Sequence, residues 1–236
     1  MNYIGIDIGS TCAKTVVLNE KKELILEFVQ PTGWSSVDTA EEIRQKLEFA
    51  GINLSNESSH CVATGYGRIS VPYADKTVTE ITCHALGAVH LFQHPDLTVI
   101  DIGGQDTKII QIEQGFVKDF IMNDKCAAGT GRFLEVMANT LSLRPNEMFD
   151  LARLGSDTTI SSMCTVFAES EVIGLIGKGE PKENIAYAVV NSTIRKVAAQ
   201  VSRMNGEMFT FCLTGGLCEC DYIREALSKE LGKDVF

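Results

Sequence analysis

Two cysteines that each precede a helical pattern are the residues of this sequence best suited to metal or redox chemistry. Cys126 lies in residues 123–132, which lead into a predicted helix, and Cys164 directly precedes a helix predicted over residues 165–176. A helix N-terminus stabilises the thiolate that binds metals, so both cysteines are candidate metal ligands. Their spacing alone leaves a zinc site and buried structural thiols open as alternatives.

The loop that follows Cys126 also has the composition of an anion site. Gly129, Thr130 and Gly131 are small residues at the start of a predicted helix. We expect them to leave backbone N–H groups uncovered, and the positive end of the helix dipole favours an anion there. The sequence therefore predicts a thiolate and an anion site within one short segment.

Two aspartates in similar turns form the second set of candidate residues. Asp7 and Asp101 each end a strand pattern, and a glycine-containing turn begins two residues later. The carboxylate is a hard ligand for Mg²⁺, and turn N–H groups and hydroxyls form a nest for phosphate. Two such turns facing each other across a cleft would hold a nucleoside triphosphate and its metal. We therefore expect Asp7 and Asp101 to be catalytic, together with Gln105, whose amide can orient an attacking water.

The remaining candidates lie in the same two turns, in the loop after Cys126, and in a third turn that follows a late strand. Lys14 adds a positive charge for phosphate, and the side chain of Cys12 is expected to pack within the turn. The predicted phosphate-binding residues are Ser10, Thr11, Cys12, Ala13, Lys14, Gly103 and Gly104. The predicted residues for the rest of the nucleotide are Gly129, Thr130, Gly131, Gly215 and Gly216.

The elements that must position these residues form an internal repeat. Asp7 and Asp101, Gly9 and Gly103, and Lys14 and Lys108 are all separated by 94 positions, within a repeated strand–turn–strand–turn–strand pattern. The repeat predicts two related lobes that face each other. We place them at residues 1–94 and 95–236, with both candidate metal ligands in the second lobe.

Composition restricts the class of protein. The chain has 236 residues, 44% of them hydrophobic, which is enough for two modest cores. A net charge of −10 without a basic cluster argues against nucleic-acid and membrane partners. Eight cysteines without a signal-peptide pattern predict reduced thiols in a cytoplasmic protein.

The order of the turns resembles the superfamily of acetate and sugar kinases, actin and the heat-shock chaperone ATPases. The motifs more closely resemble the ATP-dependent activators of 2-hydroxyacyl-CoA dehydratases and the related benzoyl-CoA reductase ATPase subunits. The resemblance covers essentially the whole chain, and it is most specific at residues 5–11, 63–68, 74–76, 101–106, 123–134 and 162–173. It implies an α/β fold, a two-lobed actin-like ATPase built from duplicated ribonuclease H-like domains. The family normally continues with a strand and a helix, whereas this sequence ends at Phe236.

The resemblance also implies a mechanism and its partners. A homodimer would hold one [4Fe–4S] cluster through Cys126 and Cys164 of each chain, and it would bind ATP with Mg²⁺. Electrons would come from a ferredoxin or flavodoxin, and ATP hydrolysis would drive single electrons onto a dehydratase-type partner enzyme. Two alternatives from other classes are a sugar or carboxylate kinase without a cluster and a non-catalytic nucleotide sensor dimerised by zinc.

Overall fold

The computed structural model describes residues 1–54, 58–123, 125–161, 164–204 and 209–236. The chain divides into two compact units, Met1–His84 and Ala85–Phe236. The division falls within helix α2 (Glu80–Phe92), whereas the sequence places the boundary after residue 94 in the segment that follows this helix.

The first unit contains a five-stranded sheet in the order β3-β2-β1-β4-β5. Strand β1 pairs antiparallel with β2 and parallel with β4. Its strands are β1 (Asn2–Ile8), β2 (Cys12–Leu18), β3 (Leu24–Pro31), β4 (Ser59–Thr64) and β5 (Lys76–Thr77). Helix α1 (Ser36–Phe49) begins after Ser35, whose side chain accepts a hydrogen bond from the Asp38 N–H and so caps the first turn.

One face of this sheet and one face of α1 form the core of the first unit. Ile4, Ile6 and Ile8 are buried because alternate residues of a strand point to the same face. Ile43 and Leu47 are buried as well, since residues four apart lie on one side of a helix. The core therefore fixes the end of β1, where Asp7 is located.

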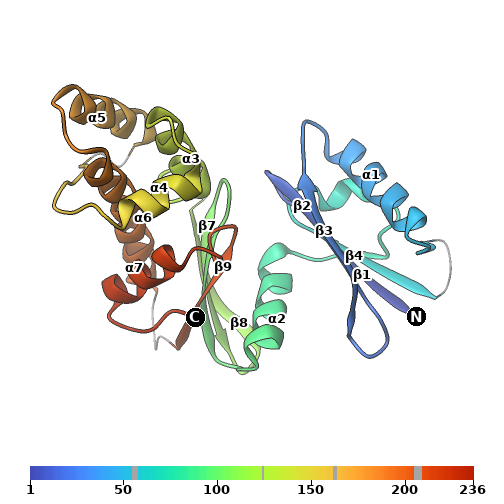
Figure 1. Cartoon of the computed structure of the whole chain (residues 1–236). Coiled ribbons are helices and arrows are strands. Elements are labelled where there is room, and N and C mark those ends of the chain that lie inside the picture. The colour runs from blue at the N-terminus through green and yellow to red at the C-terminus, as the bar shows by residue number, and fades with distance from the viewer. Residues whose placement is uncertain (55–57, 124, 162–163, 205–208) are drawn as a thin grey trace. The chain divides into compact units, whose positions relative to one another are not determined.

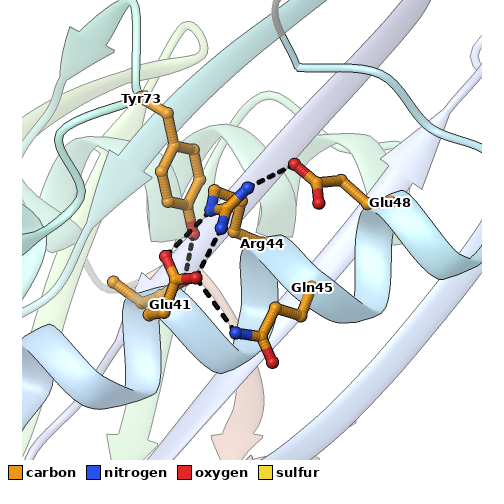
Figure 2. A network of polar contacts seen from close by, with 6 residues as sticks. Glu41, Arg44, Gln45, Glu48 and Tyr73 are labelled. Carbon is orange, nitrogen blue, oxygen red and sulfur yellow. Dashed lines mark hydrogen bonds and ion pairs between the residues drawn. The ribbon is translucent and has the colours of Figure 1, made fainter.

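The opposite face of α1 carries a polar network (Figure 2). The Arg44 guanidinium donates to Glu41 at 2.8 Å and to Glu48 at 2.5 Å, and it holds the pKa of the Glu41 carboxyl at about 2. Gln45 also donates to Glu41, at 3.0 Å. Tyr73 reaches across to the helix and donates to the Ala40 carbonyl at 2.6 Å. This last bond ties the segment after β4 to α1.

The second unit contains a four-stranded sheet in the order β8-β7-β6-β9. Its strands are β6 (Leu97–Ile102), β7 (Thr107–Glu113), β8 (Phe116–Asn123) and β9 (Thr210–Gly215). Every residue of β6 is buried, so this strand lies in the centre of the unit. Val235 forms a parallel bridge with Phe211, which places the end of the chain beside β9 as β5 lies beside β4.

Five helices accompany this sheet and gather on one side of it in Figure 1. They are α3 (Gly131–Thr140), α4 (Pro145–Ala152), α5 (Thr165–Gly177), α6 (Lys182–Val201) and α7 (Asp221–Leu231). Helix α6 is central, because its apolar residues are buried along its whole length in the main core of the unit. Within the described part of the chain, no helix combines the length and apolarity that a membrane span requires.

Strand register confirms the predicted internal repeat. Asp7 lies opposite Lys14 in the β1–β2 pair, and Asp101 lies opposite Lys108 in the β6–β7 pair. The parallel neighbour also matches, because Asp7 lies beside Thr64 and Asp101 beside Thr214. The two units therefore place equivalent residues at equivalent ends of their sheets.

Substitution of Gly65, the residue that follows β4, tests how closely the loop after β4 packs against the end of β1. Gly65 has φ +83°, and an added Cβ would collide with the Asp7 carboxylate and lie 2.5 Å from the Ile8 carbonyl oxygen. Gly51 has φ +79° but nothing within 4 Å of an added Cβ, so it is a matched control. We expect Gly51→Ala to lower the free energy of unfolding by about 1 kcal/mol, the cost of the left-handed backbone.

Gly65→Ala carries the same backbone cost and must also displace packed backbone, so we expect a loss at least ~1 kcal/mol larger. Urea unfolding of both variants measures the difference. Equal losses would show that β1 and the loop after β4 are not packed against each other as described.

Candidate functional site

The two repeated turns close in the same way. In the first turn (residues 9–14) the Gly9 N–H donates to the Cys12 carbonyl at 3.1 Å, and in the second turn (residues 103–108) the Gly103 N–H donates to the Asp106 carbonyl at 2.9 Å. An added Cβ would lie 2.9 Å from the Cys12 oxygen at Gly9 and 2.6 Å from Asp106 Oδ1 at Gly103. Both turns therefore require glycine at their first position.

The aspartate at each turn pairs with the lysine opposite it, but in different surroundings. Lys14 Nζ lies 3.1 Å from Asp7 Oδ2, and the two side chains are 50% and 35% exposed. Lys108 Nζ lies 3.5 Å from Asp101 and 2.7 Å from Asp106, and all three side chains are at most 10% exposed. Asp106 stands 94 positions after Cys12, so the second turn has an additional carboxylate that holds its lysine inside the protein.

A third loop borders the aspartate in each unit. Gly215 has φ +85°, and an added Cβ would lie 2.6 Å from both Asp101 Oδ1 and the Ile102 oxygen. Gly65 occupies the equivalent position beside Asp7 in the first unit. Sequence reasoning assigned Gly215 to the nucleotide but missed Gly65. A Thr-Gly pair at the end of β4 (Thr64-Gly65) and at the end of β9 (Thr214-Gly215) could have identified Gly65 from the sequence.

The other predicted residues of the turns differ in their exposure to solvent. Ala13 is 1% exposed and belongs to the core of the first unit, so only its backbone is available to a ligand. Cys12 is half-buried, as expected for a packing residue. The exposed candidates are Ser10, Thr11, Lys14, Gly104, Gln105 and Gly216.

Helix α3 begins directly on the second turn. The Gly131 N–H donates to the Gly103 carbonyl at 2.9 Å, and the Arg132 N–H donates to the Gly104 carbonyl at 2.8 Å. The Thr130 N–H donates to the Ala127 carbonyl at 3.0 Å. The prediction of uncovered N–H groups is therefore wrong for Thr130 and Gly131, because backbone carbonyls already occupy these donors. The Gly131 and Arg132 donors connect α3 to the second turn, and the Thr130 donor closes the loop before the helix, so neither Thr130 nor Gly131 offers an open N–H to an anion.

The cysteine loop (residues 126–130) is held by side chains from the sheet. Asn123 Nδ2 donates to the Cys126 carbonyl at 2.9 Å and to the Ala128 carbonyl at 3.2 Å. Thr107, at the start of β7, donates to the Gly129 carbonyl at 2.6 Å, and this contact is buried. Cys126 itself is half-buried. Thr107 belongs to the second turn and pairs with Asn123 of β8, so the loop and the turn share one support.

Cys164 is exposed and occupies the N-cap position of α5. Its carbonyl accepts a hydrogen bond from the Ala168 N–H at 2.8 Å. The segment before it is fixed by Glu171, which accepts bonds from the Ser161 N–H at 3.0 Å and from the Ser161 hydroxyl. Residues 162 and 163, which belong to the motif around Cys164, lie outside the described residues.

Two other cysteines, Cys61 and Cys212, are suited to packing and not to metal binding. Burial raises the pKa of the Cys61 and Cys212 thiols to about 12, so both stay protonated at neutral pH. Among the described residues, no group of three or more His, Cys, Asp or Glu side chains is placed to hold a metal ion.

Removal of the Lys108 charge tests whether the buried ion cluster supports the second turn. Lys108→Met leaves Asp101 and Asp106 buried without this cation, so we expect a loss of about 3–5 kcal/mol in the free energy of unfolding. Lys118→Met removes an exposed pair with Glu113 and should cost less than about 1 kcal/mol. Denaturant unfolding at pH 7 compares the two. Similar losses would contradict the structural role of the buried cluster.

Comparison with known proteins identifies relatives over almost the whole chain. The (R)-2-hydroxyglutaryl-CoA dehydratase activating ATPase of Acidaminococcus fermentans is 42% identical, over 98% of this chain and 89% of the relative. The activator of lactoyl-CoA dehydratase of Anaerotignum propionicum is 40% identical, over 100% of this chain and 90% of the relative.

Solved structures agree with the predicted fold. The activator of the 2-hydroxyisocaproyl-CoA dehydratase from Clostridium difficile, solved with bound ADPNP, matches with a TM-score of 0.88 at 34% identity, covering 100% of this chain and 88% of that one. The predicted actin-like ATPase fold is thereby confirmed. Residues 4–236 match the BadF/BadG/BcrA/BcrD ATPase family, and the chain belongs to that family.

Proposed function

We propose that this protein uses ATP hydrolysis to pass single electrons to a 2-hydroxyacyl-CoA dehydratase or a similar CoA-ester reductase. The proposal assigns it a homodimer with one shared [4Fe–4S] cluster, and a ferredoxin or flavodoxin as electron donor. Its relatives that are named as dehydratase activators support the class of partner enzyme.

The observation that carries the proposal is the junction between the second turn and helix α3. The carbonyls of Gly103 and Gly104 accept the first N–H groups of α3, and Cys126 lies in the loop immediately ahead of that helix. A change in the turn on nucleotide hydrolysis would therefore displace the segment that carries the cysteine. Hydrolysis in this arrangement drives a conformational change and need not transfer phosphate to an acceptor.

The cysteines fit a cluster that is shared between two chains. A [4Fe–4S] cluster requires four thiolates, and each chain offers Cys126 and Cys164, so a two-fold dimer supplies the full set. Helix α5 presents exposed apolar side chains beyond Cys164, namely Val166, Phe167, Ile173 and Ile176. Apolar residues gathered on one helix favour a protein partner there. When bound, the cluster supplies a one-electron carrier.

Residues of the two turns have distinct proposed roles in hydrolysis. Asp7 and Asp101 would hold Mg²⁺, directly or through water, and Ser10, Thr11, Lys14, Gly103 and Gly104 would bind phosphate oxygens. The exposed Gln105 would orient the attacking water. Cys12, Ala13, Gly129, Thr130, Gly131, Gly215 and Gly216 would shape the nucleotide site through backbone and packing.

The position of Asp106 favours hydrolysis over kinase chemistry. A kinase needs a carboxylate base to deprotonate its acceptor hydroxyl, and a glutamine such as Gln105 cannot serve as one. Asp106 is the neighbouring carboxylate, but it is buried and bound to Lys108 at 2.7 Å. The second turn therefore presents an amide, and not a free carboxylate, to its surroundings.

Iron analysis under anaerobic conditions tests the cluster. We expect roughly two iron atoms per wild-type chain, because four iron atoms are shared by two chains. Cys126→Ser and Cys164→Ser should each lose nearly all iron, since each removes two of the four ligands from the dimer. Cys218→Ser, at another exposed cysteine, is the matched control and should retain it. Iron at the wild-type level in Cys126→Ser would rule out the cluster assignment.

A further inference from the structure

The second unit contains a cavity of about 430 Å³, and Gly129 is the one residue among its described lining that also has a role in the proposed function. Its lining comes from the end of β8, residues 128–129, Phe133 of α3, residues 158–161, and the stretch from Ala188 to Arg203, which covers the second half of α6 and the turn after it. Cavities that bind small molecules in proteins usually measure about 300–1,000 Å³. The cavity is therefore large enough for a small organic ligand.

The charge of the cavity is opposite to that of the chain. Arg195, Lys196 and Arg203 line it, and its described lining contains no Asp or Glu, although the chain carries a net charge of −10. Within the described part of the protein, none of these three cations forms an ion pair. Two cations on α6 and one in the turn after it, without acidic partners among the described residues, attract an anion.

A buried amide on the same helix lacks a partner. Gln200 lines the cavity and is 4% exposed, and its Oε1 has no hydrogen-bond partner among the described residues. A buried polar atom without a partner costs about 1–3 kcal/mol, and a ligand or water in the cavity would supply the partner that Gln200 Oε1 lacks. Gln200 lies one helical turn after Lys196 on α6, and Arg203 follows in the turn after the helix.

The remaining walls are mainly apolar, with small hydroxyl groups and the amides of Asn123 and Asn191. Ile121, Phe133 and Ile160 supply apolar surface, and Thr158, Thr159 and Ser161 supply hydroxyls. Arg195 and Lys196 are neighbours on α6, whereas Arg203 stands apart from them beyond the end of the helix. This arrangement suits an elongated molecule with an acidic group at one end and an apolar body.

We propose that this cavity binds an organic anion that carries a phosphate or carboxylate on an apolar chain. Arg195 and Lys196 hold the acidic group, Gln200 hydrogen-bonds to the ligand, and the apolar walls cover its chain. The site belongs to the second unit alone and requires neither a cluster nor a nucleotide.

The cavity also contacts both segments that carry the candidate metal ligands. Residues 128–129 follow Cys126, and residues 158–161 precede Cys164. Lys196 packs directly on the first of these segments, since a Cβ added to Gly129 would lie 2.9 Å from Lys196 Cγ. An occupied site would therefore restrain both segments, so ligand binding should slow alkylation of Cys126 and Cys164 in metal-free protein.

Titration calorimetry with hexyl phosphate and hexanoate tests the site, with 1-hexanol as the uncharged control. We expect at least one of the two anions to bind wild-type protein at least tenfold more tightly than 1-hexanol does, and to weaken as salt increases. The double variant Arg195→Gln, Lys196→Gln should lose at least tenfold in affinity for that anion. Lys229→Gln, an exposed lysine on α7, is the matched control and should bind as wild type does.

Two results would overturn the proposal. One is an anion affinity no higher than that of 1-hexanol, and the other is equal binding by wild type and by the double variant. Arg203→Gln is a second variant of the cavity, and circular dichroism tests whether each variant is folded. Binding is measured without nucleotide or iron, so failure here is independent of the cluster assignment.

Discussion

The structure of the second unit depends on a short backbone junction. Helix α3 places its first N–H groups on the carbonyls of Gly103 and Gly104, so the turn and the helix cannot move independently. Backbone donors at a helix start must find partners, and here the turn provides them. The cysteine loop completes the junction, because Thr107 at the start of β7 and its partner Asn123 on β8 hold it. The cysteine loop and the candidate phosphate turn are thereby linked by direct hydrogen bonds.

The two halves of the duplication differ in how deeply the aspartate–lysine pair is buried. Both turns retain the aspartate, the closing glycine and the lysine, but the first aspartate–lysine pair is partly exposed and the second is buried with Asp106. An exposed lysine can move to a ligand, whereas a buried one serves mainly to fix its partners. The first turn is therefore the more adaptable, and the second is the more rigid base for α3.

The sequence predicted the repeat and the strand ends because both depend on local patterns. Asp7 and Asp101 stand at matching strand ends, and Thr165 begins a helix as expected. The prediction of uncovered N–H groups was wrong for Thr130, which bonds to Ala127 within its own loop, and for Gly131, whose acceptor Gly103 lies in a turn almost thirty residues earlier. The contacts of Glu171 with Ser161 and the burial of Asp106 likewise depend on tertiary packing, which no local pattern specifies.

Hydrogen exchange at the start of α3 tests most directly whether the turn and the cysteine loop act as one unit. Metal-free protein would be compared with ADP and with a non-hydrolysable ATP analogue, and exchange followed for the amides of Thr130, Gly131 and Arg132. The account predicts that these amides change together with residues 103–106 when the nucleotide changes. If residues 103–106 respond and the three amides do not, the junction does not transmit the state of the nucleotide, and the coupling is contradicted.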